Sequence, residues 1–305
     1  MVKEYVSFSD QVKIIKDFPA PRSPKGYPHF RKFYLMGILS SFQEATGDKE
    51  IDASYNSVLM QALREKAPTY YITDEMELAA SNTSVPPMSP NEIPFNYLNI
   101  FTKNIAAAVR VKTMDEASKK IDVRDALGKA AYREDIQFKG SDAQLVIVAV
   151  IFAADKAVKG AYRRLYLDLI PPYGDNKDTL ICGSHSFGYA SDFDEKMIHM
   201  GKSFGALARL LVNSVLLIKH QPSLVSVEKS VGSGIGFSNK SSNDPMPVRW
   251  LGKTFSNDRT GFRSTGGHAS PRAHWRRGHW HGYRYGEGRK TLKRKWVQPV
   301  YVNPQ

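Results

Sequence analysis

Histidine, arginine and tyrosine side chains alternate in a short stretch near the end of the chain, where residues 276–283 read RRGHWHGY. Histidine exchanges protons near neutral pH, and arginine holds phosphate groups through its guanidinium. Cleavage of RNA through the 2′-hydroxyl needs a general base, a general acid and a cation beside the phosphorane charge. The stretch therefore has the residue types of a metal-independent ribonuclease, with His279, His281 and Tyr283 as candidate catalytic residues.

The histidines of this stretch also have a spacing that a metal ion could use. His274, His279 and His281 form an H-x4-H-x-H pattern, and three histidines can hold a catalytic zinc ion. No carboxylate lies near them in the sequence, however, and the guanidinium groups of Arg276 and Arg277 would repel a cation. The sequence thus predicts neither a metal site nor a cofactor.

The net charge of +13 is concentrated in the last fifth of the chain. Residues Arg249–Gln305 contain 13 of the 43 Lys and Arg residues, but only two acidic residues, together with all four tryptophans. Cations neutralise phosphates and aromatic rings accept bases, each stack contributing about 1–3 kcal/mol. This combination predicts a nucleic-acid-binding surface. The predicted binding residues are Arg272, His274, Trp275, Arg276, Arg277, His279, Trp280, His281, Tyr283, Arg284, Arg289, Lys290, Lys293 and Lys295.

Other interpretations of the basic block remain open at this point. Its tryptophans and histidines could instead close an edge of the core, while the charges keep the chain in solution. A basic field also steers association with an acidic protein partner. Packing and binding can coexist, because one face of a strand pair can pack while the other face binds RNA or a ribosome.

The block has the pattern of a β-hairpin. Aromatic residues favour strands over residues 275–285 and 292–302, and Gly286-Glu287-Gly288 between them suits a turn. Side chains alternate between the two faces of a strand. We therefore expect His279, His281 and the tyrosines to share one face and Trp280 to lie on the other. On the return strand, Leu292, Trp296, Val300 and Val302 should face inward.

The preceding part of the chain predicts an α+β fold with N-terminal helices, a mixed central sheet and a long covering helix. The prolines of residues 1–27 indicate an extended lead-in, followed by helices over residues 28–46 and 53–66. Residues 114–134 have helical spacing. The apolar run Leu145–Ala154 predicts a buried central strand. Further strands are expected at residues 163–170, 179–184 and 248–251, and the long helix at residues 192–218.

These elements suggest four regions along the sequence. They are a helical N-terminal region (1–80), an α+β core (95–225), a Gly/Ser/Asn-rich connection (226–270) and the basic hairpin tail (271–305). Cys182 has no partner within the chain, the first residues lack a secretory signal, and the longest apolar run is far short of the ~20 residues that span a bilayer. We therefore expect a cytoplasmic protein that does not insert into membranes.

Residues 271–303 also resemble the C-terminus of a known family. The residues that carry the resemblance are Arg272, His274, Arg276, Arg277, Gly278, His279, Trp280, His281, Gly282, Tyr283, Gly286, Gly288, Trp296, Pro299, Val302 and Asn303. They are similar to the tail of a type V-A anti-CRISPR family of phages and mobile elements. That family recognises the N-terminal peptide of the nascent type V-A effector nuclease and causes loss of its messenger RNA.

The resemblance implies a protein that acts in the cytoplasm of a bacterial host. Its partners would be a nascent CRISPR effector peptide and RNA or the ribosome, and its effect would be translation-coupled loss of a message. On this interpretation the chain is not itself an enzyme. The alternatives are a ribonuclease toxin that cuts RNA directly, and an anti-defence adaptor that binds protein without contacting nucleic acid.

Overall fold

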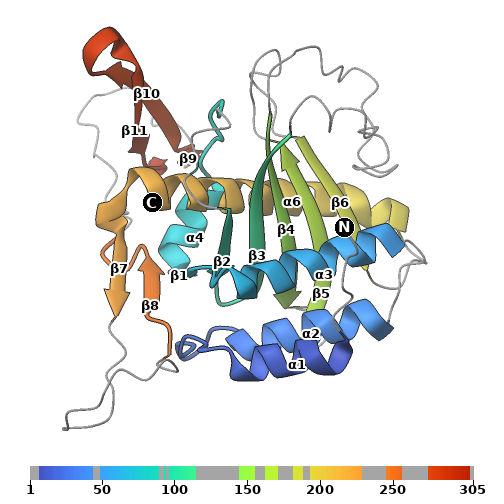
Figure 1. Cartoon of the computed structure of the whole chain (residues 1–305). Coiled ribbons are helices and arrows are strands. Elements are labelled where there is room, and N and C mark those ends of the chain that lie inside the picture. Colours follow the sequence, from blue (N-terminus) through green and yellow to red (C-terminus); the bar gives the residue numbers. More distant parts are fainter. Residues whose placement is uncertain are drawn as a thin grey trace, which may run out of the picture.

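The computed structural model describes residues 7–43, 49–88, 93, 96–114, 144–154, 162–170, 181–187, 193–228, 245–255 and 274–302. Helices cover both faces of an eight-stranded mixed sheet, and a separate pair of strands stands beside one end of the longest helix (Figure 1). This arrangement confirms the predicted α+β fold class. No helix among the described residues is long and apolar enough to cross a membrane.

The large sheet has the strand order β6-β5-β4-β3-β2-β1-β8-β7. Strand β1 runs parallel to its two neighbours β2 and β8, and the other neighbouring strands are antiparallel. The strands are β1 (Thr69–Ile72), β2 (Tyr97–Phe101), β3 (Ile105–Met114), β4 (Gln144–Ala154), β5 (Tyr162–Ile170), β6 (Ile181–Phe187), β7 (Val225–Glu228) and β8 (Val248–Leu251). The strands predicted from the sequence correspond to β4, β5, β6 and β8.

Strand β4 shows why an unbroken apolar run forms an interior strand. Ile147, Ala149 and Ile151 pack into the core on one face of the sheet, whereas Val150 and Phe152 pack into the core on the other. Because helices cover both faces, both sets of alternating side chains are buried, and a polar alternation would be costly. The predicted buried central strand is confirmed.

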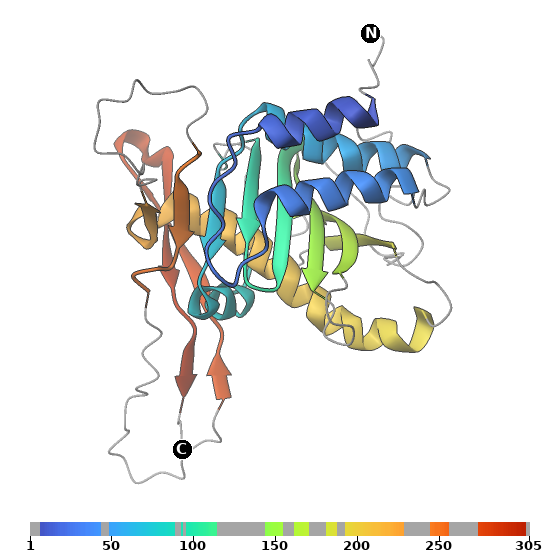
Figure 2. The same ribbon diagram turned by 90° about the horizontal axis from the view of Figure 1, so that it is seen from below.

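Three helices cover one face of the sheet: α1 (Phe8–Asp17), α2 (Phe30–Gln43) and α3 (Lys49–Arg64) (Figure 2). The second and third lie close to the predicted helices. The prediction of an extended lead-in over residues 1–27 was wrong, because it contains α1. The Ser7 hydroxyl caps this helix by accepting a hydrogen bond from the backbone N–H of Asp10 at 3.2 Å. Ile15 of this helix is fully buried against the core.

The opposite face is covered by α4 (Asp74–Ser81) and by α6 (Phe193–His220), the predicted long helix. Leu211 and Val215 of α6 are fully buried against the sheet. The predicted start of a helix over residues 114–134 was wrong, because Met114 is the last residue of strand β3. The rest of that expected helix lies outside the described residues.

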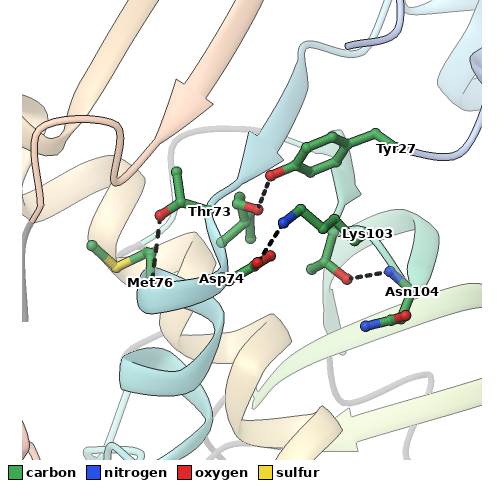
Figure 3. Close-up of polar contacts among 8 residues, drawn as sticks. Tyr27, Thr73, Asp74, Met76, Lys103 and Asn104 are labelled. Atoms are coloured by element: carbon green, nitrogen blue, oxygen red, sulfur yellow. Dashed lines mark hydrogen bonds and ion pairs between the residues drawn. The ribbon is translucent and has the colours of Figure 1, made fainter. Parts of the chain in front are cut away.

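The start of α4 joins several distant parts of the chain (Figure 3). Thr73 caps the helix through its hydroxyl, which accepts from a backbone N–H of the first turn at 3.4 Å. The Tyr27 hydroxyl donates to the carbonyl of Ile72 at 2.9 Å, and Lys103 forms an ion pair with Asp74 at 2.5 Å. Both charged groups of that pair are about half exposed, so solvent screens their attraction and the pair contributes little to stability.

The C-terminal tail forms the predicted hairpin, but this hairpin does not join the large sheet. Its main strands are β10 (His279–Tyr285) and β11 (Thr291–Val297), and the shorter β9 (His274–Arg276) and β12 (Val300–Val302) pair beyond them. At the turn, Gly286 and Gly288 have φ angles of 81° and 63°. Only glycine adopts such angles readily, which explains the glycines at these positions.

Candidate nucleic-acid interface

The strand register divides the hairpin into two faces. In β10 and β11 the opposed pairs are His279 with Val297, His281 with Lys295, Tyr283 with Lys293 and Tyr285 with Thr291, and these eight residues form what we call the outer face. The intervening pairs are Trp280 with Trp296, Gly282 with Arg294 and Arg284 with Leu292. These six residues form what we call the inner face, in which Arg284 near the turn is exposed.

The inner face is attached to the body through a buried asparagine. The indole Nε1 of Trp280 donates to the side-chain oxygen of Asn213 in α6 at 2.9 Å. The amide nitrogen of Asn213 donates in turn to the carbonyls of Ala80 and Thr83, at 2.9 and 2.8 Å. Asn213 is fully buried and Trp280 is 9% exposed. A polar group without partners would be costly at this depth, so the three bonds fix hairpin, α6 and α4 together.

A second attachment forms where Gly278 passes Thr83. The backbone N–H of Gly278 donates to the carbonyl of Asn82 at 3.1 Å, and the N–H of Ser84 donates to the carbonyl of Gly278 at 2.9 Å. A Cβ atom at Gly278 would lie 2.5 Å from the hydroxyl oxygen of Thr83, so only glycine permits this approach. The same hydroxyl accepts from the indole of Trp296 at 3.2 Å.

One cation of the tail belongs to this attachment rather than to a binding surface. Arg294 lies on the inner face, is 7% exposed and donates through its guanidinium to the carbonyl of Pro87. A charge-assisted bond to a backbone carbonyl compensates part of the cost of burying the guanidinium. The count of tail cations in the sequence therefore overstates the charge that is available to a ligand.

The ring of Trp280, which is predicted to contact nucleic acid, is buried in the body. The indole lies 6.1 Å from the ring of His220, measured between centroids. Trp296 packs 5.5 Å from Phe255, and Trp250 packs edge-on against Tyr27 at 5.4 Å. A large ring gains more from burial than from exposure. For these three tryptophans the interpretation as core closure is the better one.

The outer face is exposed along its whole length. Tyr283 and Tyr285 are 41% and 49% exposed, and their ring centroids lie 6.5 Å apart with an angle of 48° between the planes. The two histidines of this face, Lys293 and Lys295 are exposed as well. Among the residues that the structure describes, no carboxylate forms an ion pair with either lysine. The face therefore presents cations and rings to solvent together.

Cationic side chains continue from the hairpin onto α6. Arg276 and Arg277 are exposed at the base of the hairpin. Arg209 of α6 donates through Nε to the carbonyl of Ser81 at 2.7 Å, and burial together with the nearby charge of Arg277 lowers the pKa of its guanidinium. Arg209 is not among the residues predicted from the sequence, although an arginine within the apolar stretch 207–217 is a signal in itself.

The remaining predicted residues fall into two groups. Arg284, Arg289 and Lys290 are exposed near the turn, with Arg289 in the left-handed region at a φ of 51°. His274 and Trp275 are placed only as backbone, in β9 opposite Val302 and Tyr301. Arg272 and the side chains of His274 and Trp275 lie outside the described residues.

The three candidate catalytic residues share the outer face, where His279, His281 and Tyr283 occupy alternate positions of β10. They stand on an exposed two-stranded ribbon, whereas catalytic groups usually work in a cavity from which water is excluded. A hollow in the described structure lies elsewhere, between α2 and strands β3 and β4. No three His, Cys, Asp or Glu side chains come together as a metal site in the described part of the chain. This geometry suits binding of an extended anion better than bond cleavage.

A sequence model of the family described as AcrVA2-like, Anti-CRISPR type V subtype A2 family, matches residues 171–304. The match confirms the resemblance of the tail and extends it toward the N-terminus through α6, β7 and β8. It therefore includes both Asn213 and Trp280, which join the long helix to the hairpin. It supports an anti-CRISPR-like function. No curated protein and no solved structure matches the chain.

Proposed function

We propose, starting from the anti-CRISPR family match over residues 171–304, that the chain recognises the nascent N-terminal peptide of a type V-A effector nuclease and silences the effector's messenger RNA. In this proposal the hairpin contacts RNA or the ribosome, and the body captures the peptide. The chain acts as an adaptor between the two rather than as a nuclease.

The outer face of the hairpin is the observation that carries the proposal. It presents the cations Lys293 and Lys295 without an ion-pairing carboxylate among the described residues, beside two exposed histidines and two exposed tyrosine rings. Cations of this kind release counterions when they neutralise phosphates, which favours binding to any RNA and makes it dependent on salt. A ribosome offers the same phosphate surface close to the emerging peptide.

The hollow beside α2 supports a role of the body in peptide capture. It is lined mainly by apolar side chains, among them Phe33, Met36 and Phe152. His29 and Lys32 also line it. Met36 is 37% exposed, so part of this apolar lining faces solvent. In this proposal an apolar side chain of the incoming peptide packs against this apolar lining.

The first experiment separates recognition of the peptide from recognition of the message. A bacterial strain expresses the chain together with an effector gene in three forms: native, recoded with synonymous codons, and altered in its first amino acids. We expect the message to be lost from the native and the recoded genes and to persist from the altered gene. Equal loss of all three messages, or survival of the recoded one, would overturn peptide recognition.

The second experiment tests the hairpin in the same strain. The double variant Arg276→Ala/Arg277→Ala should leave the effector message and the effector protein near their unsilenced levels, because two phosphate contacts are removed. Lys13→Ala/Lys16→Ala removes two exposed cations from α1 and serves as the matched control. Full silencing and full ribosome association by the Arg276/Arg277 variant would contradict a role of the tail in RNA contact.

A further inference from the structure

Two tyrosine rings and two lysines form a compact group on the outer face. Tyr283 stands directly opposite Lys293, while Tyr285 follows Tyr283 on the same strand and on the same face. Lys295 stands opposite His281, so that the two lysines line one strand and the two rings line the other. A ligand that lies along the hairpin would thus meet rings on one side and cations on the other.

The spacing of the rings selects the form of the nucleic acid. The ring centroids lie 6.5 Å apart, whereas successive bases in one strand of a duplex are about 3.4 Å apart. Two neighbouring bases can therefore lie on the two rings only if they separate from each other. Bases of a duplex are also paired and stacked, so that their faces are closed to a side chain, while those of a single strand can turn outward.

We propose that the outer face binds single-stranded RNA, with unpaired bases stacked on Tyr283 and Tyr285 and phosphates held by Lys293 and Lys295. This inference rests on the proposed function, because it names the ligand class of the same face. Stacking on a ring and neutralisation of a phosphate both tolerate any base, so that binding depends little on sequence. The mode suits an adaptor whose specificity comes from a peptide.

The binding test uses the full chain and two labelled probes, measured by fluorescence anisotropy at one salt concentration. One probe is an oligouridylate of about ten nucleotides, within the usual site sizes for single strands. The other is an RNA duplex with the same number of phosphates. We expect the single strand to bind at least about tenfold more tightly, since only it can use both the rings and the lysines.

Variants of the two rings give the decisive comparison. Tyr283→Ala and Tyr285→Ala should each weaken binding of the single strand by about 5- to 100-fold and leave the duplex unaffected, whereas Tyr→Phe at either position should keep the affinity. Val227→Ala is the control, because it removes an exposed apolar side chain from strand β7, outside the outer face. Both tyrosines are exposed, so these variants should fold as the parent does.

The contradicting results separate this inference from the proposed function. If the duplex binds as tightly as the single strand and only lysine variants weaken binding, the stacking mode is wrong while RNA contact stands. If neither probe binds the unaltered chain, both are wrong. If the alanine variants keep their affinity for RNA but no longer bind a ribosomal protein that the unaltered chain binds, the rings contact protein instead of RNA. The inference is then wrong.

Discussion

The two faces of one hairpin both carry aromatic rings and cations, but they have opposite surroundings. Trp280 and His281 are neighbours in the sequence, yet Trp280 is bonded to a buried asparagine of α6 and His281 is exposed beside a lysine. The inner face has cations too, but its Arg294 is bonded to a backbone carbonyl. Composition therefore identified the hairpin as a segment of interest. The residues that attach it to the body are distinguished from those that face solvent only by the alternation of strand side chains and by the position of the body.

The largest contrast between the faces should appear on truncation of a ring. Trp280→Ala should lower the free energy of unfolding by about 3–5 kcal/mol, because it removes a buried indole and leaves a cavity. Tyr283→Ala on the outer face should change it by less than about 0.5 kcal/mol. Urea unfolding followed by circular dichroism measures both. Similar values for the two variants would show that the faces are not divided as described.

A smaller effect is expected at the asparagine that joins hairpin and body. Asn213→Ala should cost about 1–3 kcal/mol for each buried group that it leaves unpaired. Asn213→Asp keeps an acceptor for Trp280 but loses the donor for the two carbonyls of Ala80 and Thr83, so it should be destabilising as well. Thermal unfolding of both variants checks this expectation. An unchanged midpoint in the alanine variant would contradict the structural role of Asn213.

Buried tyrosine rings of the body, unlike the exposed rings of the outer face, should make the free energy of unfolding depend on pH above 10. Burial raises the pKa of Tyr71 to about 12, and burial together with the acidic side chains Asp74, Glu77 and Glu75 raises that of Tyr27 to about 12. Both pKa values in the folded protein exceed the usual 10, so folding favours the neutral tyrosines. Their contribution to the free energy of unfolding is complete below pH 10 and is lost between about pH 10 and 12. Urea unfolding across this range should show the decline, and Tyr71→Phe should make it shallower. The same slope in both proteins would contradict the assignment to Tyr71.

Much of the fold follows from local patterns in the sequence. The apolar run of β4, the periodicity of α6 and the glycines of the hairpin turn each predicted an element that the structure contains. The alternation in β10 also placed His279, His281 and Tyr283 on one face as predicted. The helix α1 was missed, because the prolines that follow it outweighed the cap spacing of Ser7 and Asp10.

The parts of the site that the sequence did not predict depend on contacts between distant residues. Trp280 meets Asn213 from 67 positions away, and Trp296 meets Thr83 from 213 positions away. No local period encodes such a partner, so the burial of Trp280 and the place of Arg209 beside the hairpin became visible only in the fold. A ring beside cations has the same local pattern whether it stacks on a base or packs into a core, so the sequence alone did not place Trp280.

The salt dependence of RNA binding tests the division of the hairpin most directly. We expect the slope of log K against log salt for a single-stranded RNA to fall in magnitude by about 1.4 in Lys293→Ala/Lys295→Ala, which is about 0.7 for each phosphate that the variant no longer neutralises. The control Lys13→Ala/Lys16→Ala on α1 should keep the parent slope. A parent slope in the Lys293/Lys295 variant, with its fold intact, would contradict the account of the outer face as the surface that meets RNA.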